Sequence, residues 1–69
     1  MTLIWQGKTT CDLCGQDVGS ELVDGKTVFG PWATMCLACN AENGVGLGTG
    51  RGQLYYKTQN QEYEKVNGL

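Results

Sequence analysis

A chain of 69 residues with a formal net charge of −2 is long enough for one small domain, expected here over 1–69. It contains no histidine, which excludes Cys₂His₂ and Cys₃His metal sites, histidine general bases and Ser-His-Asp or Cys-His catalysis. Its five basic residues are spread along the chain instead of forming a stripe, which disfavours general binding to nucleic acid. We therefore expect a protein that is not an enzyme.

The N-terminal region has neither the basic nor the apolar segment of a secretory signal. No apolar run approaches the roughly 20 residues that a membrane-spanning helix needs. We expect a cytoplasmic protein without membrane contact. In a reducing compartment, cysteines are expected to bind a metal in preference to forming disulfides.

The first half of the chain predicts a short strand, a cysteine turn and a hairpin. Leu3-Ile4-Trp5 is a strand candidate, and Gly15 after Cys14 suits the positive φ that follows such a turn. Asp24-Gly25 between two apolar arms is typical of a type I′ turn, so strands are expected at about 20–23 and 26–29. Gly30-Pro31 would end the second strand.

The second half predicts a helix and another hairpin. Good helix formers favour a helix over about 35–43, with Cys36 and Cys39 on its first turn and Gly44 as its C-terminal stop. Strands are expected at 53–58 and 62–66, joined by a turn at 59–61. A cysteine knuckle, a hairpin, a helix bearing the second cysteine pair and a C-terminal hairpin predict a small α+β domain of treble-clef type. A zinc ribbon is the alternative.

Two CxxC pairs dominate the sequence, with residues 15–35 between them. Each pair supplies two sulfurs from one tight turn, so two pairs complete a closed tetrahedral site for structural Zn²⁺. A domain this small needs a stabilising cross-link such as a bound metal, because its hydrophobic core alone gives marginal stability. Iron of the rubredoxin type is the less favoured metal, because Asn40 stands where glycine is expected. The predicted ligands are Cys11, Cys14, Cys36 and Cys39.

Glycine recurs at every second position from Gly44 to Gly52. In an extended backbone this would leave one bare face and one face carrying Val45, Leu47, Thr49 and Arg51. Glycine costs entropy when ordered, so the run predicts a close approach to another part of the chain or to a ligand. It matches no phosphate-binding fingerprint, but its backbone N–H groups could form an anion nest beside Thr49 and Arg51.

The aromatic residues allow two interpretations. Trp32, Tyr55, Tyr56 and Tyr63 could anchor a partner or stack on bases, or they could fill the core. The adjacent Tyr55 and Tyr56 must face opposite sides if they lie on a strand.

A pattern over most of residues 8–57 resembles a group of small uncharacterised proteins encoded by bacteriophages and prophages. It consists of Gly30-Pro31-Trp32-Ala33, then Met35 and the second cysteine pair, then the glycine run through Gly52-Gln53 and Tyr55. The resemblance implies a short zinc-finger protein of phage type and assigns no activity.

We expect a non-catalytic binding module whose partner is a host or phage protein. The alternative is capture of a nucleotide or another phosphate-bearing small molecule by the glycine run. A nucleic-acid-associated regulatory zinc finger is a further alternative of lower weight. The candidate binding residues are Trp32, Gly46, Gly48, Thr49, Gly50, Arg51, Gly52 and Tyr56.

Overall fold

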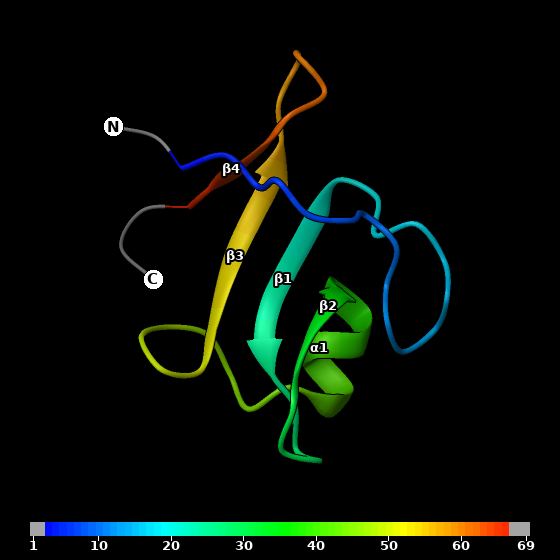
Figure 1. Ribbon diagram of the computed structural model, residues 1–69, viewed down its shortest axis with the longest axis vertical. Helices are drawn as coiled ribbons and strands as arrows, with labels where there is room; N and C mark the ends of the chain where they lie inside the picture. The colour runs from blue at the N-terminus through cyan, green and yellow to red at the C-terminus, as the bar shows by residue number, and fades with distance from the viewer. Residues whose placement is uncertain (1–2, 67–69) are drawn as a thin grey trace.

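The computed structural model describes residues 3–66. Within them, four antiparallel strands form one sheet in the order β2-β1-β3-β4, accompanied by one helix (Figure 1). This confirms the α+β class. The elements are β1 (Glu21–Lys26), β2 (Trp32–Cys36), α1 (Leu37–Asn43), β3 (Gly52–Lys57) and β4 (Tyr63–Lys65).

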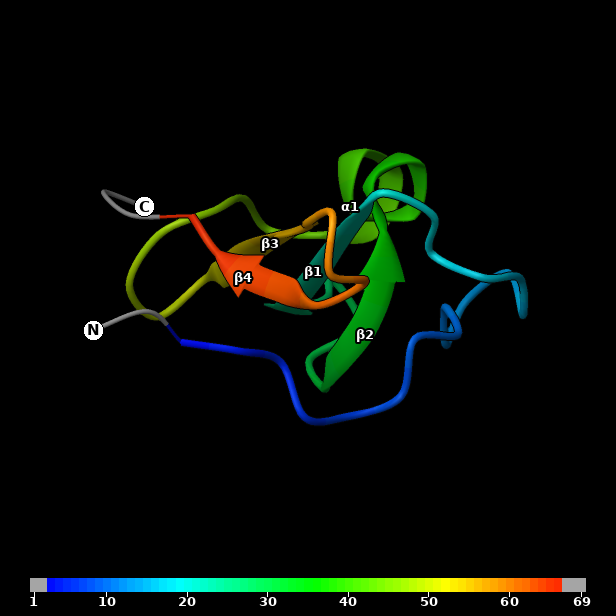
Figure 2. The same ribbon diagram turned by 90° about the horizontal axis from the view of Figure 1, so that it is seen from above.

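The sheet is covered on both faces. Figure 2 shows α1 over one face and the first part of the N-terminal segment (residues 3–20) passing across the other, before the segment turns beside the sheet and returns to β1. Leu22 and Val23 of β1 are consecutive and both completely buried. Because consecutive side chains of a strand point to opposite faces, each face must carry part of the core.

The strand register divides the core between these faces. Val23 lies opposite Met35 of β2, whereas Leu22 lies opposite Tyr55 of β3. The ring of Trp5 packs on Tyr55 with the ring centroids 5.4 Å apart. The N-terminal segment therefore supplies part of the hydrophobic cover of its face.

The expected hairpin at Asp24-Gly25 is wrong, because β1 runs straight through both residues. The turn lies at 27–31, where the Thr27 N–H and hydroxyl both donate to the Pro31 carbonyl oxygen, at 3.0 and 2.8 Å. Gly25 faces Gly52 of β3, and a Cβ at residue 25 would lie 3.3 Å from Gly52 Cα. Gly25 is therefore needed for the close approach of two strands.

The helix is confirmed, but it begins at Leu37. Cys36 is the N-cap residue and retains the extended conformation of β2. Gly44 follows the helix with φ −84°, so it does not supply the left-handed stop that was expected. Instead, its lack of a side chain leaves room for Asn40, as a Cβ at residue 44 would lie 2.0 Å from Asn40 Oδ1.

The C-terminal hairpin is confirmed as β3 and β4, with a turn near Gln61 that has φ 65°. β3 has the six residues expected, shifted by one position, whereas β4 is shorter than the predicted strand at 62–66. The expected N-terminal strand is reduced to a single bridge between Ile4 and Glu64, which covers the outer edge of β4. No helix among residues 3–66 is long and apolar enough to cross a membrane.

Candidate metal centre

The four cysteines come together from two places in the chain. Cys11 and Cys14 lie on a turn of the N-terminal segment, closed by a 3.0 Å hydrogen bond from the Gly15 N–H to the Cys11 carbonyl oxygen. Gly15 has φ 77°, as expected. Cys36 ends β2 and Cys39 lies in the first turn of α1. All four Sγ atoms lie within 4.8 Å of one another.

This arrangement fits one tetrahedrally coordinated ion. In a tetrahedron with Zn–S bonds of about 2.3 Å, the sulfurs are about 3.8 Å apart. Cys14 Sγ and Cys36 Sγ are 4.0 Å apart, and all four thiols are free of disulfide bonds. A slight contraction would bring the sulfurs to bonding distance. Four thiolates fill every position of such an ion and leave none for substrate.

The thiols differ in how readily they ionise. Burial alone would raise the pKa of Cys11, but hydrogen bonds from the backbone N–H groups of Cys14, Cys36 and Leu13 lower it to about 6. The pKa of Cys39 is raised to about 12 by its contacts with the sulfurs of Cys36 and Cys11. A cation would be needed for all four sulfurs to be thiolates together, because like charges in one site oppose ionisation.

The residues beside the first cysteine pair form a small polar network that the sequence interpretation missed. Lys8 forms an ion pair with Asp12, which stands between Cys11 and Cys14. Hydrogen bonds from Lys8 and from the Thr34 N–H lower the pKa of Asp12. A lysine four residues before an acid is a recognisable local signal, but the partner on β2 is not visible in the sequence.

The glycine run forms a closed loop instead of an extended strand, so the expected bare face is wrong. Gly46, Gly48 and Gly50 have φ values of 118°, 116° and 78°, and Gly48 pairs with Gly52 at the start of β3. The alternate glycines therefore supply positive φ, which other residues rarely adopt.

The loop is organised around its own arginine. A Cβ on Gly48 would lie 3.3 Å from Arg51 Nη2, and one on Gly46 would lie 3.7 Å from Arg51 Nη1. The guanidinium thus lies over the two glycines, while Thr49 is exposed at the end of the loop. The described residues form no pocket here or elsewhere, so an anion would have to bind on an open surface.

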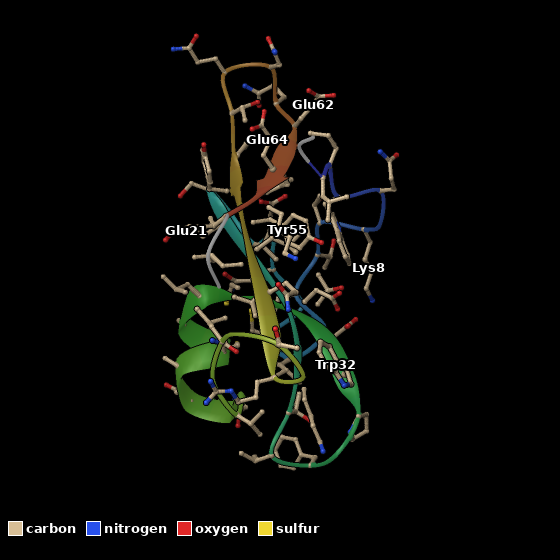
Figure 3. All side chains as sticks on the ribbon, turned by 90° about the vertical axis from the view of Figure 1, so that its left-hand side faces the viewer. Lys8, Glu21, Trp32, Tyr55, Glu62 and Glu64 are labelled. Carbon is tan, nitrogen blue, oxygen red and sulfur yellow. The ribbon has the colours of Figure 1, made fainter. Side chains whose placement is uncertain are left out.

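The candidate binding residues do not form one surface. Trp32 pairs with Lys26 at one end of β1, whereas Tyr56 pairs with Glu21 at the other end. Lys26 and Glu21 are five positions apart and therefore point to opposite faces. In Figure 3, Trp32 lies on the side away from the helix and far from Glu62 and Glu64. Trp32 and Tyr56 are each 48% exposed, whereas Tyr55 and Tyr63 are buried.

Exposed apolar side chains lie at the turn between β1 and β2, here called the hairpin tip, residues 27–32. Phe29 is 70% exposed, Val28 is 62% exposed, and Trp32 at the start of β2 is also exposed. The sequence interpretation placed Val28 and Phe29 in a strand. Gly30-Pro31 directly after them was the available signal for a turn.

Comparisons of the chain with protein-family models, with curated proteins and with solved structures give no match.

Proposed function

We propose that this protein is a non-catalytic, zinc-stabilised domain of treble-clef type that acts by binding another protein. The convergence of four cysteine sulfurs within 4.8 Å carries the zinc assignment. The order of elements supports the treble-clef assignment, because a cysteine knuckle is followed by β1, β2 and a helix that begins at the second cysteine pair. A saturated four-thiolate ion stabilises a fold and offers no open position for catalysis.

Metal analysis tests the zinc assignment directly. Protein purified under reducing conditions should contain one zinc per chain. Removal of the ion by a strong chelator should unfold it, because structural Zn²⁺ contributes roughly 10–16 kcal/mol of apparent free energy in small peptides. A coloured protein with iron in place of zinc would identify the alternative metal. A metal-free protein of unchanged thermal stability in chelator would contradict the proposal.

The exposed hairpin tip supports the protein-binding part of the proposal. Phe29 and Trp32 are large aromatic side chains on a hydrogen-bonded turn, and buried aromatic side chains dominate the energetics of many protein interfaces. Lys26 directly precedes the tip and its N–H donates to the Arg51 carbonyl oxygen, and neither residue's side chain forms an ion pair with any described residue. The partner we propose is a cytoplasmic host or phage protein, in accordance with the resemblance to small phage proteins.

A paired set of variants tests the tip as the contact surface. Phe29→Ser/Trp32→Ser should abolish cross-linking to a specific partner while leaving zinc content and melting temperature unchanged. Tyr56→Ser is the matched control, because Tyr56 and Trp32 are equally exposed but lie at opposite ends of β1. Equal cross-linking by the tip variant and the control would contradict the tip assignment. The zinc assignment would then stand on its own measurement.

A further inference from the structure

The first cysteine turn continues the sheet at the outer edge of β2. The Asp12 N–H donates to the Thr34 carbonyl oxygen at 2.7 Å, and the Thr34 N–H donates to Asp12 Oδ2 at 2.8 Å. Thr34 lies opposite Asp24 of β1, and because both its N–H and its carbonyl oxygen bond to Asp12, this is a non-hydrogen-bonded pair whose Thr34 backbone groups point away from β1. Asp12 alone supplies both the donor and the acceptor that a neighbouring strand would offer there.

This contact joins the two halves of the metal centre. Asp12 lies next to Cys11, and Thr34 lies two residues before Cys36. The two cysteine pairs are otherwise separated by residues 15–35, so bringing them together has an entropic cost. A reciprocal pair of hydrogen bonds beside the sulfurs fixes the position of the first pair relative to β2.

The Asp12 side chain is held from both sides. Its Oδ2 accepts from Thr34, and its Oδ1 accepts from the Lys8 ammonium group. Both oxygens are therefore occupied, and rotation of the carboxylate would break one of the two interactions. Buried or restrained partners of this kind orient the residues that bind a metal without touching the metal themselves.

We propose that Asp12 is a positioning residue for the metal centre: through Thr34 it aligns Cys11 and Cys14 with Cys36 and so raises the affinity of the four thiols for Zn²⁺. This inference rests on the proposed zinc site. It adds a residue outside the cysteine pairs to the determinants of metal affinity.

Titration of the metal-free protein with Co²⁺, followed by competition with Zn²⁺, measures this affinity. Tetrathiolate Co²⁺ has characteristic visible absorption, which reports the ligand set separately from the affinity. Asp12→Ala should weaken Zn²⁺ binding by about 10- to 100-fold, the usual effect of losing a partner that orients the ligands. The absorption spectrum should stay that of four thiolates. Asp12→Asn keeps an oxygen for the Thr34 N–H but loses the charge, so its weakening should be smaller.

Asp17→Asn is the matched control. Asp17 lies on the same segment, and its Oδ1 also accepts a backbone N–H, that of Gly19 at 2.7 Å, but it has no hydrogen bond to β2. The Asp17→Asn variant should bind Zn²⁺ within about threefold of the wild-type affinity, because removing the Asp17 charge leaves the two cysteine pairs aligned. Amide hydrogen exchange in the zinc-loaded proteins should show faster exchange of the Thr34 N–H in Asp12→Ala alone.

The outcomes separate the two proposals. A wild-type protein that binds neither Co²⁺ nor Zn²⁺ overturns the zinc site and this inference with it. A wild-type protein that binds tightly, with Asp12→Ala and Asp12→Asn equally tight, overturns only the positioning role. Equal weakening by Asp17→Asn also overturns it, because the effect would then belong to the charge of the segment.

Discussion

The hydroxyl of Tyr63 donates a hydrogen bond to the backbone carbonyl oxygen of Gly19. Tyr63 belongs to β4, whereas Gly19 lies just before β1. The backbone carbonyl of Tyr63 in turn accepts a 2.8 Å hydrogen bond from the Trp5 N–H. Tyr63 therefore ties the last strand to both ends of the N-terminal segment that carries the first cysteine pair.

Replacing Tyr63 by phenylalanine should lower the free energy of unfolding by about 0.5–1.5 kcal/mol, because the Gly19 carbonyl loses its partner while the buried ring is retained. Urea denaturation of the zinc-loaded protein measures the change. Tyr56→Phe is the control, because Tyr56 is exposed, and it should change stability by less than about 0.5 kcal/mol. Equal effects of the two variants would show that the hydrogen bond contributes nothing.

Alkaline pH should destabilise the protein through its buried tyrosines. Burial raises the pKa of Tyr63, with a further contribution from the charge of Asp17, and burial with the charge of Asp24 raises the pKa of Tyr55. The folded state therefore holds both protons more tightly than the unfolded state, in which a tyrosine has a pKa of about 10. This contribution is complete below pH ~10 and is lost as the pH rises through the folded-state values.

Denaturation curves measured from pH 8 to 11 test this directly. The free energy of unfolding should decrease above pH ~10, and the decrease should be shallower in Tyr63→Phe, which has one such proton fewer. Lysine titration contributes equally to the wild type and to Tyr63→Phe, so it cancels in the difference between their free energies of unfolding. Parallel decreases in both would assign the alkaline loss to groups other than Tyr63.

Gly44→Ala should destabilise the end of the helix by steric conflict. The backbone at residue 44 has φ −84°, which alanine adopts readily, but the new Cβ would lie 2.0 Å from Asn40 Oδ1 and 2.7 Å from the Asn40 carbonyl oxygen. Overpacking of this kind costs about 1–3 kcal/mol. Thermal denaturation of Gly44→Ala, Asn40→Ala and the double variant should show partial rescue in the double variant, because the carbonyl contact remains. Strictly additive losses would contradict the assigned clash.

The parts of the structure that the sequence predicted are those with local causes. The cysteine turns, the helix after Cys36 and the C-terminal hairpin each follow from neighbouring residues, and so does the opposite orientation of Tyr55 and Tyr56. The prediction of a hairpin at Asp24-Gly25 was wrong because the role of Gly25 depends on a residue far away in the sequence. Gly25 allows β1 to approach Gly52 of β3. The contact between Asp12 and β2 was missed for the same reason.

The glycine run illustrates this limit most clearly. Its period of two is compatible with an extended strand, and only the positions of Arg51 and β3 reveal a loop with positive φ at alternate residues. The residues that the sequence suggested as one binding surface lie on separate surfaces for a related reason. Trp32 and Tyr56 are placed by strand register, which decides both the face and the end of the sheet where each lies.

Gly50 and Gly52, two glycines of the same run, are required for different reasons. A Cβ on Gly52 would lie 2.9 Å from the Gly46 carbonyl oxygen and 3.3 Å from Gly25 Cα, so backbone atoms block it on two sides. Gly50 has open space around it but a φ of 78°. In Gly52→Ala, the new Cβ must push β3 away from β1 or from the loop at Gly46. In Gly50→Ala, the alanine needs only to adopt a left-handed backbone conformation.

Gly52→Ala should therefore be the more destabilising change, at about 2–3 kcal/mol for a rigid backbone conflict. Gly50→Ala should cost about 1–2 kcal/mol, the penalty for placing a side chain in the left-handed region. Gly50→Asn should recover part of that loss, because asparagine tolerates this region, while Gly52→Asn should be no better than Gly52→Ala. Urea denaturation of the four zinc-loaded variants makes the comparison. If Gly50→Ala proved as damaging as Gly52→Ala and asparagine rescued both, positive φ would be the common requirement, and the close approach of β1 to β3 would not explain Gly52.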